Sequence, residues 1–443
     1  VYGYGKVKLG LVAYDILSYD KSLENHKSFS CEELKEIEPH IRTKHCQGGF
    51  VYCDCQVTYP ERLCLENILL AKAAGAEVHN YAEVTQLIQD GRTVRGVRVR
   101  HTLTGEEDEI HASLVVNAAG PWVDQVLNRK YTPSERRMGG TKGSHLLLPR
   151  FEGGPRHAIY VPAHQDGRPF FIIPWRDYYW VGTTDIRYNG DLDHVHITKE
   201  EIDYLLTEVN FVFPMAQMTP EDIIYCLSGI RPLPKTEDET EEAEITRRHI
   251  IFDHDREELE GLLSIIGGKL TTYRNLAEET VDYIFHKFHK ERPHCRTREE
   301  PLWGGGMKDI NRYVQDNSRR FSRPGELSPE QVAYLISVYG TRFKDVLRLT
   351  EQEPALRQRI CPNNPDIKAQ IVFSVQNELP QTLADIYLRR TGIGTSACKG
   401  LDCAREGAKL MGKLLGWRRK RVKQEVEEYK KVVQELYRCS PGA

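Results

Sequence analysis

The sequence shows no strong charge bias and no long apolar run. Lys plus Arg number 61 and Asp plus Glu number 64, so the formal net charge is −3 at pH 7. This balance argues against a nucleic-acid binder whose affinity rests on a global positive field. No apolar stretch reaches the roughly 18 residues of a membrane-spanning helix, so none is predicted, although this test does not address contact with a membrane surface.

The 11 cysteines are an odd number at irregular spacings. A small secreted disulfide scaffold would be shorter and richer in cysteine, so we expect reduced thiols in a cytoplasmic protein. Hydrophobic residues make up 40% and charged residues 28% of the chain, which is a globular balance and excludes wholesale disorder. A length of 443 residues allows two or three domains.

The strongest local signal is a strand at 262–266 that runs through Gly267 and Gly268 into a helix extending to about His289. Two glycines let a ligand approach the backbone closely, and the helix N-terminus offers free N–H groups and a positive dipole end. The pattern therefore predicts that an anionic or electron-rich group binds here. An ordinary strand-to-helix turn is the alternative interpretation.

Small residues also follow a second buried strand, in the segment Asn117-Ala118-Ala119-Gly120. Such residues at the C-terminal end of a strand match the crevice where doubly wound sheets bind ligands. Close packing of a helix on the strand would explain them equally well.

Two further segments carry side chains suited to chemistry. His145 ends the segment Lys142-Gly143-Ser144-His145, just before an apolar run, and faces either a site or the protein surface or core. Arg231 stands in Ser228-Gly229-Ile230-Arg231-Pro232-Leu233, where its planar guanidinium suits a phosphate or another oxyanion. A structural ion pair is the alternative for Arg231.

Together these segments carry a resemblance to a known family. Five motifs occur in its order and spacing: Val-Asn-Ala-Ala-Gly-Pro-Trp (116–122), Lys-Gly-Ser-His (142–145), Gly-Thr-Thr-Asp (182–185), Ser-Gly-Ile-Arg-Pro-Leu (228–233) and Gly-Gly-Lys-Leu-Thr-Thr-Tyr-Arg (267–274). Over essentially its whole length, the chain resembles the FAD-dependent glycerol-3-phosphate dehydrogenases of the aerobic, respiratory type.

The resemblance implies a mixed α/β fold of three parts. A doubly wound FAD/NAD(P)-binding domain, incomplete in this chain, is expected at residues 62–130 and 255–290. An antiparallel-sheet substrate domain is expected at 1–61 and 131–254, and a C-terminal helical cap domain at 300–443.

The resemblance also implies an activity. These enzymes oxidise sn-glycerol 3-phosphate to dihydroxyacetone phosphate, passing a hydride from C2 to FAD and the electrons on to a quinone. His145 and Arg231 match catalytic positions, and substrate binding is implied for Arg231, Arg247 and Lys269. The residues implied to bind the cofactor are Ala119, Gly120, Gly267, Gly268, Lys269, Leu270 and Thr271.

Physical chemistry is consistent with these roles. Oxidation needs a base within hydrogen-bond reach of the C2 hydroxyl, and an imidazole is poised near neutral pH. A phosphate dianion needs fixed cations, which Arg231 would supply bidentately. The implied location is cytoplasmic, and a peripheral place on the inner face of the cell membrane and a homodimer are left open. An oxidase that passes electrons to oxygen is the enzymatic alternative.

The family opens with a Gly-x-Gly-x-x-Gly turn that is absent here. We expect that a block of some tens of residues precedes Val1 in the complete protein, and that this chain by itself binds FAD poorly. A truncated relative that binds substrate or a partner without catalysis is therefore a further alternative. An amino-acid oxidase of the wider fold family is more distant, since it would not need cations for a phosphate.

Cys398 and Cys403 are the remaining oddity. They resemble half of the cysteine set in iron–sulfur domains attached to anaerobic relatives, but two thiolates are only half of a four-ligand set. Cys361 could add at most one more. We therefore expect buried or incidental cysteines, and no metal site.

Overall fold

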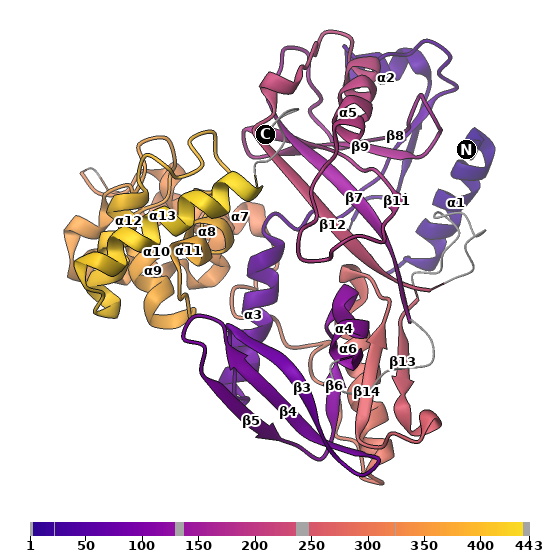
Figure 1. The fold of residues 1–443 in the computed structure, drawn as a ribbon. Helices are drawn as coiled ribbons and strands as arrows, with labels where there is room; N and C mark the ends of the chain where they lie inside the picture. Colours follow the sequence, from indigo (N-terminus) through magenta and orange to yellow (C-terminus); the bar gives the residue numbers. More distant parts are fainter. Residues whose placement is uncertain (1–2, 22, 129–136, 236–247, 324, 437–443) are drawn as a thin grey trace.

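The computed structural model describes residues 3–21, 23–128, 137–235, 248–323 and 325–436. Its elements form a large antiparallel sheet, a smaller sheet with parallel pairing, an antiparallel meander and a helical domain (Figure 1). Among the described residues, no helix is both long enough and apolar enough to cross a membrane.

The large sheet has six strands, five of them in the order β11-β7-β10-β9-β8, and β12 pairs along the opposite edge of β7 from β10 and β11. Their bounds are β7 (Met138–Pro149), β8 (Ile159–Pro162), β9 (Pro169–Trp175), β10 (Tyr178–Gly182), β11 (Ile186–Arg187) and β12 (Tyr225–Pro234). Helix α5 (Lys199–Val212) covers one face, where Leu146, Ile172 and Leu205 are fully buried in a shared core. A threonine with a glutamate three residues later predicts a capping box, and Thr198 and Glu201 form one at the start of this helix.

The second sheet has the order β13-β14-β6, from β13 (Ile250–Asp253), β14 (Leu262–Ile266) and β6 (Val115–Asn117). β14 and β6 are parallel, with Ser264 opposite Asn117. Their C-terminal ends therefore meet at one edge, where doubly wound folds bind ligands. Helix α4 (Val123–Asn128) lies against β14, α6 (Tyr273–Lys287) follows β14 in the chain, and α3 (Pro60–Ala73) comes earlier in the chain.

A meander of β3 (Ala82–Asp90), β4 (Thr93–His101) and β5 (Glu107–His111) lies to the left of this sheet in Figure 1. The sequence predicts a hairpin here, because period-two runs at 94–100 and 109–114 flank the turn Thr104-Gly105-Glu106, and β4 and β5 confirm it. The sequence also predicts a short strand at 76–79, after the helix stop at Gly75, but this prediction is wrong because the stretch forms no ladder in the structure. A short apolar run becomes a strand only where a neighbouring strand accepts its backbone hydrogen bonds.

The N-terminal part contains α1 (Tyr4–Leu17), β1 (Lys27–Phe29), α2 (Cys31–Ile37) and β2 (Gly49–Val51). The expectation of reduced thiols throughout is wrong here, because Cys31 and Cys46 form a disulfide with their Cα atoms 6.1 Å apart. Cys226 is also disulfide-bonded. Sequence spacing did not reveal these bonds, since pairing depends on the path of the folded chain.

The helical domain lies to one side in Figure 1, in orange and yellow. Its helices are α7 (Ile310–Phe321), α8 (Pro329–Tyr339), α9 (Phe343–Gln352), α10 (Lys368–Asn377), α11 (Leu383–Arg389), α12 (Ala404–Leu415) and α13 (Arg419–Leu436). A buried ion pair, Arg62 with Glu378 at 2.9 Å, ties α3 to this domain. The domain contains two apolar clusters, one centred on α8 to α10 and one on α11 to α13.

Two details of side-chain burial differ from the helical pattern of the sequence. Val281 and Phe288, which the pattern of α6 predicts to be buried, are exposed, and Thr280 is the buried residue of that helix. Helical periodicity identifies a shared apolar face, but burial depends on whether another element packs against it.

Candidate active site

The site is built on the antiparallel pairing of β7 with β12. Three alternate cross-strand pairs define its register: Thr141 with Arg231, Gly143 with Gly229, and His145 with Leu227. Directly opposed residues in such a pair share a face of the sheet, and alternate residues along a strand do too. His145 and Arg231 therefore lie on one face, with Gly143 between them.

The other face carries the alternate residues of the same motif. Lys142 Nζ lies 2.7 Å from Glu201 Oε2 of α5, and Ser144 Oγ donates a hydrogen bond to Glu201 Oε1 at 2.9 Å. Thr184 Oγ1 donates to the same carboxylate at 2.7 Å. Glu201 is 2% exposed, so these partners satisfy a charge that burial would otherwise make costly. Alternate residues of the motif therefore have different roles, and Lys142 and Ser144 attach the sheet to α5.

Arg231 is held by residues 183–185, which connect β10 to β11. Its Nη1 contacts Asp185 Oδ1 at 2.8 Å, and its Nη2 donates to Thr183 Oγ1 at 3.0 Å and to the Thr184 carbonyl oxygen at 3.2 Å. The guanidinium lies over Gly143, because a Cβ built there would be 2.5 Å from Nη2. The structural ion pair that was the alternative interpretation is therefore present, and it fixes the orientation of the guanidinium.

His145 stands on the same face, partly buried among aromatic side chains. Its ring lies over Gly182, where a Cβ would be 2.5 Å from Cδ2, and its centroid is 6.5 Å from that of Trp180. Burial, together with the positive charge of Arg231, lowers the pKa of His145 to about 4. The imidazole is thus neutral near pH 7 and can accept a proton.

The glycine turn after β14 has the conformation that its sequence predicts. Gly267 and Gly268 have φ of 77° and 111°, values that L side chains rarely adopt. A Cβ at Gly267 would lie 2.9 Å from the Arg248 carbonyl oxygen and 3.3 Å from Pro234 Cδ, at the end of β12. The turn therefore places the large sheet against the end of β14.

The residues after this turn begin a helix. Lys269 is the N-cap of the 3₁₀ turn η5 (Leu270–Thr272), which leads into α6, and its side chain makes no capping hydrogen bond. Lys269, Leu270 and Thr271 are all exposed. The first N–H groups of η5 therefore have no capping side chain, and the two glycines before them carry no Cβ atoms. This arrangement fits the flat, electron-rich ring of a flavin.

The small residues after β6 lie at the matching position of the parallel pair. Gly120, with φ of 57°, begins the 3₁₀ turn η1 (Gly120–Trp122), and Ala119 is its N-cap. Because β6 and β14 are parallel, Ala119 and Gly267 follow the same edge of the sheet. Arg247, the remaining predicted substrate ligand, lies outside the described residues.

Sequence reasoning missed the residues that orient the predicted ones. Asp185 and Thr183 hold Arg231, Glu201 anchors Lys142, and Trp180 packs beside His145. The motif at 182–185 was noticed only as part of a resemblance. Its polar residues directly after a strand were the available signal for a site.

Comparison with known proteins bears on this arrangement. Residues 13–274 match the FAD dependent oxidoreductase family, and residues 295–422 match the C-terminal domain of alpha-glycerophosphate oxidase. A glycerol-3-phosphate dehydrogenase of Synechocystis is 38% identical over 99% of this chain and 80% of its own length. The chain belongs to the FAD-dependent glycerol-3-phosphate dehydrogenase family.

Further relatives of this dehydrogenase family agree. The aerobic glycerol-3-phosphate dehydrogenase of Staphylococcus haemolyticus is 34% identical over 88% of this chain and 70% of its own length. The crystal structure of the Bacillus halodurans glycerol-3-phosphate dehydrogenase complexed with FAD superposes with a TM-score of 0.79 at 28% identity, covering 94% of this chain and 80% of that one. The mixed α/β fold and the FAD cofactor inferred from the sequence are thereby confirmed.

Proposed function

We propose that this FAD-dependent oxidoreductase oxidises sn-glycerol 3-phosphate to dihydroxyacetone phosphate and delivers the electrons to a quinone. The observation that carries the proposal is the convergence of three separate motifs on one face of the large sheet. They supply a neutral imidazole, His145, and a fixed guanidinium, Arg231, on the same face of the sheet. The names of the relatives support the same substrate.

In this proposal the two side chains have different tasks. Arg231, whose Nη1 and Nη2 contact Asp185, Thr183 and Thr184, supplies an oriented positive charge near the phosphate dianion. Lys269 adds a second cation from the glycine turn. Arg247 is proposed as a third substrate ligand on the resemblance alone. His145 accepts the proton of the C2 hydroxyl, for which its neutral form at pH 7 is required.

The cofactor is proposed to lie at the edge formed by β6 and β14. Ala119, Gly120, Gly267 and Gly268 would let it approach the backbone, and the N–H groups at 269–271 would face its electron-rich end. When bound, FAD supplies the hydride acceptor. The domain boundaries inferred from the sequence, 62–130 with 255–290, 1–61 with 131–254, and 300–443, are retained as part of this proposal.

An anaerobic visible spectrum of the protein supplied with FAD tests the assignment. Adding sn-glycerol 3-phosphate should bleach the flavin band, whereas glycerol and the enantiomeric phosphate should leave it unchanged. A bound flavin that a panel of amino acids bleaches, and glycerol 3-phosphate does not, would instead support an amino-acid oxidase. A chain that binds glycerol 3-phosphate in equilibrium dialysis and retains no flavin would support the non-catalytic alternative.

The acceptor is a separate part of the proposal. Reoxidation of the bleached protein by a soluble quinone, at a rate far above that in aerated buffer, would support a dehydrogenase. Stoichiometric hydrogen peroxide in aerated buffer would support the oxidase alternative. A peripheral contact with the inner face of the cell membrane and a homodimer remain predictions, which flotation with vesicles and the sedimentation coefficient would check.

A further inference from the structure

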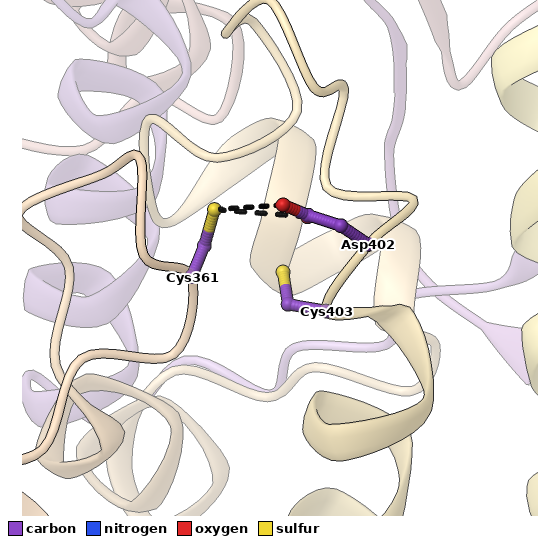
Figure 2. A group of neighbouring side chains, drawn as sticks. All are labelled: Cys361, Asp402 and Cys403. Carbon is purple, nitrogen blue, oxygen red and sulfur yellow. Dashed lines mark hydrogen bonds between the residues drawn. The ribbon is translucent and has the colours of Figure 1, made fainter.

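Two cysteines and an aspartate come together in the helical domain, away from the residues proposed for catalysis. Cys361 lies in the loop before α10, and Asp402 and Cys403 directly precede α12 (Figure 2). One ligand atom from each of the three lies within 4.8 Å of the other two. Cys361 Sγ is 3.6 Å from both carboxylate oxygens of Asp402. Cys361 and Cys403 are buried, and Asp402 is exposed.

These separations match a metal centre. In a tetrahedral zinc site, with Zn–S near 2.3 Å and Zn–O of about 2.1 Å, a sulfur and an oxygen ligand stand about 3.6 Å apart and two sulfurs about 3.8 Å apart. The distance from Cys361 Sγ to the Asp402 carboxylate is 3.6 Å. The two side chains are thus spaced as ligands of one ion.

A third cysteine lies beside these residues. Cys398 Sγ is 3.4 Å from Cys361 Sγ, but it does not belong to the group of ligand atoms that all lie within 4.8 Å of one another. Asn364 Nδ2 lies 3.4 Å from Cys361 Sγ and donates to Ser396 Oγ at 3.0 Å. Ser396 Oγ is in turn 3.2 Å from Cys398 Sγ. Such outer contacts orient ligands in metal sites.

We infer that Cys361, Asp402 and Cys403 bind one zinc ion whose fourth position is open to water. Thiolate ligands favour zinc over magnesium or calcium, and a single carboxylate is compatible with a tetrahedral site. An iron–sulfur cluster usually takes four thiolates, and only three cysteines gather here among the described residues. The N-terminus of α12, where Cys403 is the N-cap, favours negative charge on this ligand set.

The ion would act by joining two segments. It would link the loop before α10 to the residues that directly precede α12, and both segments contribute to one apolar cluster. Sequence analysis favoured incidental cysteines because two thiolates are only half of a four-ligand set.

Metal content tests the inference without any assay of activity. The protein purified from zinc-supplemented cells should contain one zinc per chain, as measured by inductively coupled plasma mass spectrometry. Replacing zinc with Co²⁺ should produce the visible bands of tetrahedral cobalt and near-ultraviolet thiolate charge-transfer bands. Asp402→Asn should weaken zinc binding by at least about tenfold in competition with a chromophoric chelator, as loss of a contact in a metal site does.

The variants separate a site from incidental binding. Asp402 is exposed, so its change to Asn does not threaten the core, whereas Cys361→Ser alters a buried residue. Cys295→Ser is the matched control, since this thiol lies between α6 and α7 and should leave the zinc content unchanged. The inference would be overturned if the wild-type protein contained no zinc and non-reducing peptide mapping showed a disulfide between Cys361 and Cys398. Zinc affinity that Asp402→Asn and Cys361→Ser leave unchanged would also overturn it.

Discussion

Arg231 of β12 and Asp185, which precedes β11, form a half-buried ion pair, with Nη1 and Oδ1 2.8 Å apart. The carboxylate, together with the Thr183 hydroxyl and the Thr184 carbonyl oxygen on the second nitrogen, fixes the orientation of the guanidinium. A phosphate dianion that binds here meets a cation whose rotamer is already set. Less side-chain entropy is then lost on binding.

Removing this guanidinium should cost far more than removing a surface one. We expect Arg231→Ala to lower kcat/KM for glycerol 3-phosphate by roughly 10²–10³-fold, as loss of one preorganised donor typically does. Arg100→Ala is the control, because Arg100 is an exposed arginine of β4 that pairs with Glu83. Steady-state kinetics with a soluble acceptor measures both. Near-normal turnover of Arg231→Ala would contradict the assigned role.

The small residue beneath the guanidinium should matter as much as its charge partner. In Gly143→Ala the new methyl group would lie 2.5 Å from Arg231 Nη2 and must displace it. We expect KM for glycerol 3-phosphate to rise at least about tenfold, since misplacing a positioned group strongly affects catalysis. Gly229→Ala, on the paired position of β12, has nothing within 4 Å of its new carbon and should behave as wild type. Equal kinetics for the two variants would count against this geometry.

His145 makes stability depend on pH in the acid range. Its folded pKa of about 4 lies below the ordinary value of 6.5, so the unfolded chain binds the proton first. The stabilisation is present above pH 6.5 and is lost as the pH falls from 6.5 through 4. Wild type should lose at most about 3 kcal/mol relative to His145→Gln between pH 7 and pH 4.

Urea denaturation at a series of pH values measures this difference. His111→Gln, at an exposed position of β5, is the control and should track wild type throughout. A difference between wild type and His145→Gln that stays constant from pH 7 to pH 4 would show that His145 is not neutral in the folded protein near pH 5.

The glycine turn should affect flavin retention. Gly267→Ala has two costs. Alanine rarely adopts the φ of 77° found here, and its Cβ would lie 2.9 Å from the Arg248 carbonyl oxygen and clash with it. Gly416→Ala is the control, because Gly416 has a similar φ of 70° but nothing lies within 4 Å of the added Cβ, so only the backbone strain remains. We expect the FAD Kd, measured by fluorescence quenching, to rise at least about tenfold in Gly267→Ala alone. A similar rise in both variants would assign the effect to general strain.

The anchor on the other face of the sheet should be structural. Glu201→Gln leaves the buried ammonium of Lys142 without its charge partner, and breaking such a pair costs about 3–5 kcal/mol. The melting temperature should therefore fall by several degrees, whereas the exposed neighbour variant Glu200→Gln should change it little. Calorimetry decides between them. An unchanged transition in Glu201→Gln would mean that the network contributes no net stability.

Much of this arrangement follows from local sequence signals. The capping box at Thr198, the hairpin around Gly105 and the turn at Gly267 each have a local physical cause, and each forms as predicted. The burial of α6 and the strand at 76–79 were not predictable in the same way. Both depend on which element lies alongside, and a window of sequence does not contain that element.

The same division holds for the sites. Sequence alone singled out His145, Arg231 and the glycines at 267 and 268 as candidate site residues, because their types suit proton transfer, phosphate binding and close backbone approach. The resemblance to a known family added the FAD cofactor, and the roles of these residues stay predictions. Only the tertiary structure brought Asp185 to Arg231, Cys31 to Cys46 and Cys361 to Cys398. These contacts join distant segments, and their partners are chosen by the path of the packed chain.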